Sequence, residues 1–283
     1  MDWSLLHESL RLGVKISLAA IPYSLVYIHL RMFNFAFGEV ITFAGYVLFV
    51  LIQHAHWPLW AALCAAVVLS AVLGVAIERV AYRPLMESKE RHLLLVSSIG
   101  VSIALQNLYQ AVFGSRTMYL DHSDVHGTSM AVVLIIEVIV LTVALRHTRY
   151  GDQVAAVASE RNLAQLLGVN PGLLYSLVFA IASALAVPAG LFELSDSGIA
   201  PDMGFHLGLV AFAATVVAGL NSIWWTVAAS LVLAFLLQLA QMSSVLNERL
   251  VWALCVIGAI LIAAARRAFR RYRRARRGED TGQ

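Results

Sequence analysis

Charged residues are scarce in this chain. Lysine, arginine, aspartate and glutamate make up 13% of its 283 residues, whereas a soluble domain carries roughly 25%. Hydrophobic residues reach 60%, and the mean hydropathy is +0.78. Because the few charges are clustered, long apolar runs remain between them. This composition excludes an ordinary soluble domain and indicates a helical protein that crosses a membrane several times.

Cysteine is rare, and the usual catalytic motifs are missing. The two cysteines, Cys64 and Cys255, each lie inside an apolar run, which is typical of small hydrophobic side chains rather than of a disulfide or metal pair. The sequence has no Gly-rich phosphate loop, no Walker sequence and no cluster with metal-ligand spacing. We therefore predict that the protein is not an enzyme and carries no cofactor or metal.

Nine apolar segments have the composition of membrane spans. A helix needs about 20 apolar residues to cross the hydrocarbon core, with roughly 17 as a lower limit. We predict an all-α polytopic membrane protein with about nine transmembrane helices. Eight or ten helices stay open, because the fifth and seventh segments are short. The segments lie at 12–30, 35–53, 58–77, 93–113, 130–145, 173–192, 206–220, 225–241 and 249–265.

Basic residues gather in alternate connecting segments. Segment 78–92 carries four, segment 146–172 carries three, and 266–277 carries eight arginines. Because Lys and Arg are enriched in cytoplasmic loops, we place these segments in the cytoplasm. With nine spans, the N-terminus then lies outside and the C-terminus in the cytoplasm. The outer segments are predicted to hold acids, at Asp121, Asp124, Glu193, Asp196 and Asp202.

This pattern predicts one domain and a tail. A single transmembrane domain covers 1–265 and includes a cytoplasmic segment at 149–172, and a basic cytoplasmic tail covers 266–283. The tail follows an apolar segment directly, so its arginines are more simply explained by anionic lipid than by nucleic acid. We expect contact with membrane lipid and none with nucleic acid.

Three charged residues lie within the apolar segments. A carboxylate in mid-bilayer costs about 2.5–3.5 kcal/mol and usually faces protein or water. Glu39 follows the run Asn-Phe-Ala-Phe-Gly, and two interpretations stay open. It is either an acid favoured by the helix dipole, or part of a path beside a broken helix, which we favour. Glu137 lies nearly central in its span, and a pair with Lys15, near the outer end of the first span, is a weaker alternative.

The segment at 149–172 contains a short amphipathic helix pattern. Ser159 is suited to begin this helix and Gly168 to end it. Three leucines fall at helical spacing and share one face, namely Leu163, Leu166 and Leu167. Such a helix can dock into a groove on a soluble partner or lie on the membrane surface, and the residues alone leave both open.

Four stretches together resemble the permease subunits of branched-chain amino-acid ABC transporters. They are NFAFGE at 34–39, ERVAYRPL at 78–85, a stretch that begins ASERNLAQLLG at 158–168, and a Gly-rich stretch at 197–223. Their order matches the family from about residue 12 to 265. The family typically shows Asn-Phe-Ala-His-Gly-Glu near the start and a Leu-Leu-Gly motif in the cytoplasmic segment.

The resemblance implies a permease in the cell inner (plasma) membrane that serves an ABC importer. Its partners would be a second permease, homologous or identical, two cytoplasmic ATPase subunits and a periplasmic substrate-binding protein. The cytoplasmic helix would then couple to the ATPases through Ser159, Glu160, Arg161, Leu166, Leu167 and Gly168. The substrate path would include Asn34, Phe35, Phe37, Gly38 and Glu39.

Departures from the family pattern keep other functions open. Phe37 stands where histidine is commonest, Ala155 where arginine is frequent, and Val210 where the family has lysine. The expected substrate is a branched-chain or related small amino acid. The alternatives are a urea or short-amide importer, and a divergent channel or scaffold that lacks an ATPase partner.

Overall fold

The computed structural model describes residues 3–30, 34–85, 92–120, 127–147, 151, 153, 157, 168, 170–219 and 222–242. The regular elements over these ranges are helices, which confirms the all-α prediction. Two extended residues, Met118 and Ile199, form an isolated antiparallel bridge. The helices are α1 (Trp3–Leu30), α2 (Phe37–Phe49), α3 (Leu59–Ile77), α4 (His92–Phe113), α5 (Gly127–His147), α8 (Pro171–Leu185), α9 (Val187–Asp196), α10 (Met203–Val217) and α11 (Ile223–Met242).

Five helical stretches are long and apolar enough to cross a membrane. They are Leu5–Leu30, Phe37–His54, Leu59–Leu85, His92–Phe113 and Pro171–Asp196. Shorter apolar helices cover Ser129–Leu145, Met203–Val217 and Ile223–Leu239. The first eight predicted segments therefore coincide with helices, and the ninth, at 249–265, lies outside the described residues.

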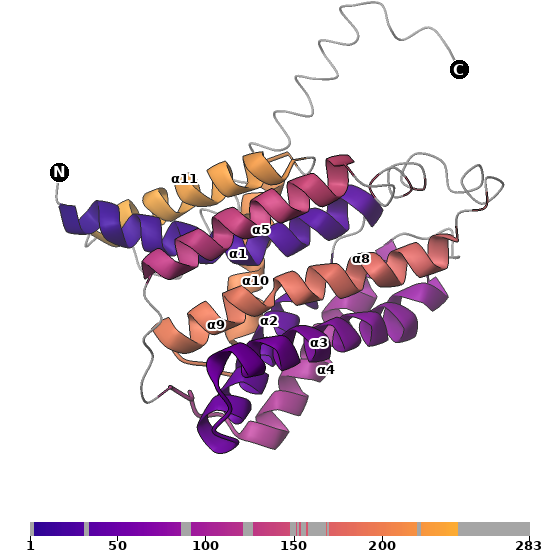
Figure 1. Cartoon of the computed structure of the whole chain (residues 1–283), viewed down its shortest axis with the longest axis horizontal. Helices are drawn as coiled ribbons and strands as arrows, with labels where there is room; N and C mark the ends of the chain where they lie inside the picture. Colours follow the sequence, from indigo (N-terminus) through magenta and orange to yellow (C-terminus); the bar gives the residue numbers. More distant parts are fainter. Residues whose placement is uncertain are drawn as a thin grey trace, which may run out of the picture.

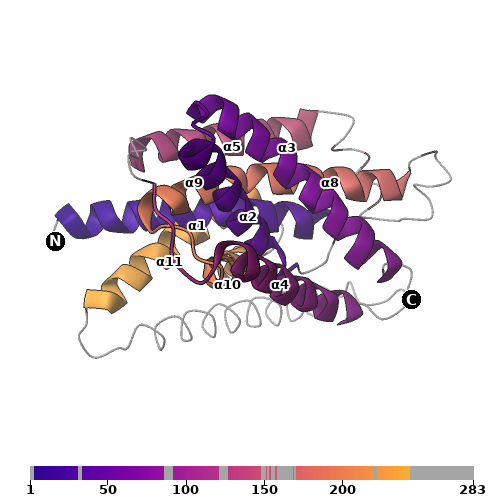
Figure 2. The ribbon, with the colours of Figure 1, turned by 90° about the horizontal axis from the view of Figure 1, so that it is seen from below.

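Two helices, α1 and α2, form the inside of the bundle. Helix α1 packs against α5, α8, α10 and α11, and α2 packs against α3, α4, α9 and α10. Figure 1 shows α1, α5 and α11 side by side along one edge, α3 and α4 at the opposite edge, and α8 and α9 between them. In Figure 2 α1 runs through the middle of the bundle. Aliphatic side chains on α3, α4 and α5 face outward, as helices facing lipid require.

Two short irregular turns extend these helices. A π-helical turn at Val50–His54 continues α2. A second π-helical turn at Glu78–Tyr82, followed by a 3₁₀ turn at Arg83–Leu85, continues α3. π-helical turns close i→i+5 hydrogen bonds and so insert one extra residue into a turn.

The prolines act differently from each other. Helix α8 ends at Leu185 and α9 begins at Val187, so the helix is interrupted just before Pro188. Helix α1 continues through Pro22. It also begins at Trp3, nine residues before the predicted span (12 − 3), so Lys15 lies near the middle of α1 rather than near its end.

The placement of Glu193 and Asp196 in an outer loop is wrong. Helix α9 extends to Asp196, and Glu193 is buried within it. The sixth predicted span ends at residue 192, because an acid inside an apolar segment is costly. The fold lowers that cost by placing Lys15 of α1 opposite Glu193.

Three glycines allow α2 and α10 to approach closely. A Cβ atom at Gly38 would overlap the carbonyl oxygen of Gly204 and lie 3.3 Å from the Cα of Gly208. The backbones of the two helices therefore touch, as small residues permit in membrane helices.

Alanine at Gly38 is expected to destabilise the protein by about 1–3 kcal/mol, because overpacking forces the two helices apart. Gly100 on α4 provides a matched control, since its Cβ would meet no atom within 4 Å. Thermal unfolding of both variants in detergent, followed by size-exclusion chromatography, measures the difference. Equal losses for Gly38→Ala and Gly100→Ala would contradict the close contact.

Candidate functional site

The segment that leads into α2 is anchored by its asparagine. Asn34 is buried, and its Oδ1 accepts a hydrogen bond of 2.6 Å from the Tyr82 hydroxyl. Residues 35 and 36 form a turn, in which the Phe37 amide donates to the Asn34 carbonyl at 3.4 Å. Residues 34–36 are therefore not helical, and Gly38 follows them inside the first turn of α2.

Glu39 lies in the first turn of α2 and is fully buried. Its Oε1 accepts a hydrogen bond of 3.0 Å from the Ser102 hydroxyl on α4. Its backbone carbonyl accepts another from the Tyr109 hydroxyl, also at 3.0 Å. Among the described residues, Oε2 of Glu39 has no hydrogen-bond partner. The carboxylate thus faces α4 inside the bundle with one oxygen unused.

The two phenylalanines of this segment point to different helices. The Phe35 ring lies 5.1 Å from that of Phe212 on α10. The Phe37 ring meets Tyr23 of α1 edge to face, with centroids 5.4 Å apart. The five residues predicted to form the path therefore contact α1, α4, α10 and the turn after α3.

Most of the predicted coupling residues lie outside the described part of the chain. These are Ser159, Glu160, Arg161, Leu166 and Leu167. Gly168 is described and exposed, and its φ of +86° is the left-handed conformation that suits a residue ending a helix. Its predicted role as a helix end is consistent with this geometry.

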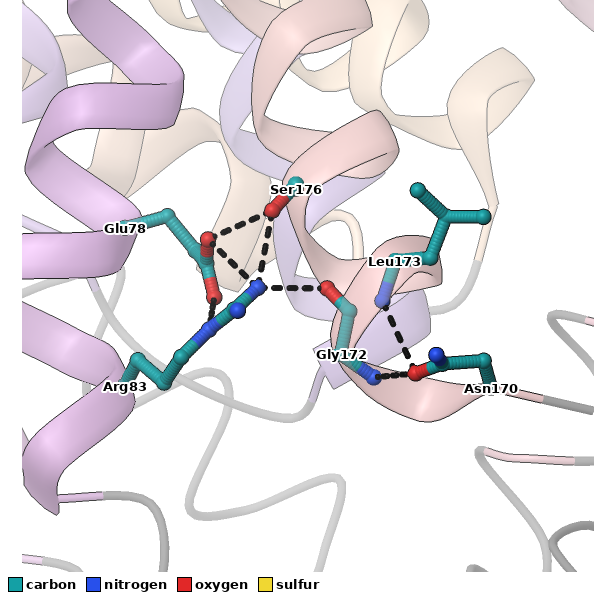
Figure 3. A network of polar contacts seen from close by, with 6 residues as sticks. All are labelled: Glu78, Arg83, Asn170, Gly172, Leu173 and Ser176. Carbon is teal, nitrogen blue, oxygen red and sulfur yellow. Dashed lines mark hydrogen bonds and ion pairs between the residues drawn. The ribbon is translucent and has the colours of Figure 1, made fainter.

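The start of α8 is fixed by Asn170 and Pro171. The Asn170 Oδ1 accepts hydrogen bonds from the amides of Gly172 at 3.0 Å and Leu173 at 3.2 Å (Figure 3). Pro171 occupies the first turn, where a missing amide costs nothing. These residues set where segment 149–172 joins the transmembrane bundle.

A polar network joins the end of α3 to the start of α8 (Figure 3). The Arg83 guanidinium donates to both carboxylate oxygens of Glu78, at 3.0 and 3.2 Å. It also donates to the Gly172 carbonyl at 2.7 Å and to the Ser176 hydroxyl at 2.9 Å. The Ser176 hydroxyl in turn donates to Glu78 at 2.8 Å. Glu78 is buried with both oxygens satisfied.

Sequence reasoning missed this network although it singled out the ERVAYRPL motif. Glu78 and Arg83 are five residues apart, and in an α-helix such residues point in different directions. The π-helical turn closes a bond from the Arg83 amide to the Glu78 carbonyl and brings their side chains together. If the motif is assumed to be α-helical, Arg83 has no partner at Glu78 and is counted only as a basic residue of a cytoplasmic loop.

A second charged group joins α1 to α9. Lys15 forms an ion pair with Glu193, lies 3.6 Å from the Asp196 carboxylate and donates to the Ser197 hydroxyl at 3.1 Å. Arg11 pairs with Asp196. Lys15 is thus paired with α9 rather than with Glu137, which was the weaker alternative.

Glu137 is the least explained charge. It is buried on α5, and within the described residues neither of its carboxylate oxygens has a hydrogen-bond partner. The described residues therefore show burial and no function for it.

Comparison with known proteins adds a family. A family model described as "Branched-chain amino acid transport system / permease component" matches residues 5–265. The branched-chain amino acid permease LivH of Escherichia coli K12 is 36% identical over 238 residues, which cover 75% of this chain and 77% of LivH. BraD of Pseudomonas aeruginosa, named in the same terms, is 32% identical over 242 residues, 76% of this chain and 78% of BraD.

One solved structure has a similar fold. PsaBC from Streptococcus pneumoniae, in complex with Fab, superposes with a TM-score of 0.50 and covers 93% of this chain and 91% of its own. Its sequence identity is 13%, so the likeness concerns the arrangement of helices alone.

Proposed function

The chain belongs to the branched-chain amino acid transport permease family, and we propose that it forms the substrate path of an ATP-driven importer for branched-chain or related small amino acids. The observation that carries this proposal is the family match over residues 5–265, which includes every described helix except the first residues of α1. The membrane-length apolar helices agree with a multi-pass membrane protein.

The importer we propose has several other subunits. Because the sequence contains no Walker motif, ATP hydrolysis belongs to two separate ATPase subunits. A second permease completes the path, and a periplasmic binding protein delivers the substrate. In this arrangement nine spans place segment 149–172 and tail 266–283 on the cytoplasmic side, where the ATPases dock.

The start of α2 around Glu39 is where we place the substrate path. A buried ionisable group at membrane depth is costly and usually functional, and a helix break beside it is a common feature of transporter sites. Glu39 combines burial, one carboxylate oxygen without a hydrogen-bond partner among the described residues, and a position directly after the non-helical residues 34–36. We therefore assign Asn34, Phe35, Phe37, Gly38 and Glu39 to the path.

Transport by the assembled complex tests this function. The permease, its ATPases and its binding protein are reconstituted in proteoliposomes, and uptake of labelled leucine is measured with and without ATP. We expect uptake that requires both ATP and the binding protein and that excess isoleucine or valine inhibits. Inhibition by urea alone would support the short-amide alternative, and uptake without ATP would support a channel.

A further inference from the structure

The 78–83 turn, the π-helical turn from Glu78 to Tyr82 together with Arg83, contacts two parts of the proposed transport machinery. On one side, Arg83 holds the first turn of α8 through the Gly172 carbonyl and the Ser176 hydroxyl. On the other side, the Tyr82 hydroxyl donates to Asn34 at 2.6 Å. A single short turn thus contacts both the start of α8 and the start of the path segment.

The first contact lies at the end of the segment that we propose to dock the ATPases, because Gly172 is the last residue of segment 149–172. Helix α8 begins at Pro171, and Asn170 caps it. Any shift of segment 149–172 therefore reaches the first turn of α8 within a few bonds. Arg83 donates a hydrogen bond to a backbone carbonyl of that turn (Figure 3). This hydrogen bond therefore depends on the position of the α8 backbone and not on the identity of a side chain there.

The dipole of α8 does not explain why an arginine lies at the first turn of this helix. The N-terminal end of α8 carries partial positive charge, which favours anions. Arg83 is held there by Glu78, whose buried carboxylate accepts two bonds from the guanidinium and one from Ser176. Glu78 has no exposed surface, whereas the Arg83 side chain is 43% exposed. The carboxylate thus fixes the guanidinium against α8.

Helices α3 and α8 are in close contact next to the turn. A Cβ atom at Gly74 of α3 would overlap the Ser183 hydroxyl of α8 and lie 2.8 Å from the Phe179 carbonyl. The Tyr82 ring is fully buried, with its centroid 5.3 Å from that of Phe179. Close packing of this kind transmits displacement because the interior has little free volume.

We propose that the 78–83 turn links the ATPase-docking segment to the substrate path, with Glu78, Arg83 and Tyr82 as positioning residues. This link rests on the proposed function. Movement of segment 149–172 displaces the start of α8, Arg83 and Glu78 carry the displacement to the turn, and Tyr82 passes it to Asn34. Hydrogen bonds join Gly172 to Arg83 and Tyr82 to Asn34, and the peptide bond between Tyr82 and Arg83 connects the two contacts.

The test measures uptake per ATP hydrolysed in the reconstituted complete transporter. Glu78→Gln/Arg83→Gln removes the guanidinium that donates to the Gly172 carbonyl. It also removes the buried Glu78 carboxylate, which Arg83→Gln alone would leave without its ion-pair partner. Tyr82→Phe removes only the hydroxyl that reaches Asn34. For both variants we expect uptake per ATP to fall roughly tenfold, within the usual range of coupling between sites. The ATPases should still co-purify.

Two controls make this result specific. Arg79 lies in the same turn and is exposed, so Arg79→Gln should keep the unsubstituted ratio of uptake to ATP hydrolysis. Leu166→Asn/Leu167→Asn should instead lose the ATPases on purification, which marks a failure of docking rather than of transmission.

The outcomes separate the link from the function on which it rests. Uptake per ATP that stays at the unsubstituted value in the Glu78→Gln/Arg83→Gln and Tyr82→Phe variants overturns the link. An Arg83→Gln defect that the double variant restores in both yield and uptake per ATP also overturns it, because only folding then depended on the pair. Absence of ATP-driven uptake by the unsubstituted transporter refutes the proposed function itself.

Discussion

Replacing Lys15 with methionine is expected to destabilise the folded chain by about 3–5 kcal/mol, because it removes one partner of a buried ion pair. The Lys15 and Glu193 side chains are 12% and 7% exposed. Without the ammonium group, the Glu193 carboxylate stays buried near that of Asp196, one turn further along α9. Thermal unfolding in detergent, followed by size-exclusion chromatography, measures the loss.

Two further variants define the cause of this loss. Lys15→Met/Glu193→Leu removes both charges and is expected to recover part of the stability, since apolar replacements of a buried pair are often neutral. Glu8→Gln alters the His7–Glu8 pair, whose atoms are 4.0 Å apart and whose side chains are 75% and 54% exposed, and should have no measurable effect. A Lys15→Met protein as stable as the unsubstituted one would show that the pair contributes nothing.

Replacing Glu39 with glutamine is expected to lower ATP-driven uptake roughly tenfold, or by about 1.4 kcal/mol in barrier height. Glutamine keeps the shape of the side chain and an oxygen that can accept from Ser102. It removes the negative charge and places an amide donor where Oε2 now lies unused. Uptake of labelled leucine into proteoliposomes, normalised to folded permease, measures the change.

Ser102→Ala serves as the comparison for Glu39. It removes the hydroxyl that contacts Oε1 and leaves the charge in place, so a role for the charge predicts a smaller loss of uptake than for Glu39→Gln. Unchanged uptake by the Glu39→Gln variant would favour the other interpretation, in which Glu39 is an acid suited to the first turn of α2.

Features that depend on a few neighbouring residues could be predicted from the sequence. The position of Glu39 near the start of α2 follows from local signals such as the Asn-Phe-Ala-Phe-Gly run and the apolar period. The eight described apolar segments are helical for the same reason. The resemblance to the permease family rested, in addition, on the order of four sequence stretches along the chain.

Features that depend on distant partners could not be predicted in this way. Glu193 was assigned to a loop because its partner, Lys15, is 178 residues away in the sequence (193 − 15). Glu78 and Arg83 are near in sequence, but they meet only because the chain departs from α-helical geometry. Neither the pairing of buried charges between helices nor an extra residue in a turn leaves a periodic signal in the sequence.

The π-helical turn after α3 makes the number of residues in this stretch matter as well as the identity of Glu78, Tyr82 and Arg83. Each residue in a helix contributes about 100° of rotation and 1.5 Å of rise. Deleting one residue between Glu78 and Tyr82 would therefore swing Arg83 away from α8 and Tyr82 away from Asn34 at once. Arg79 and Val80 are exposed in this turn, and exchanging either leaves both contacts intact. Across diverging relatives, positions 79 and 80 should accept substitutions freely, while the stretch as a whole should resist insertions and deletions.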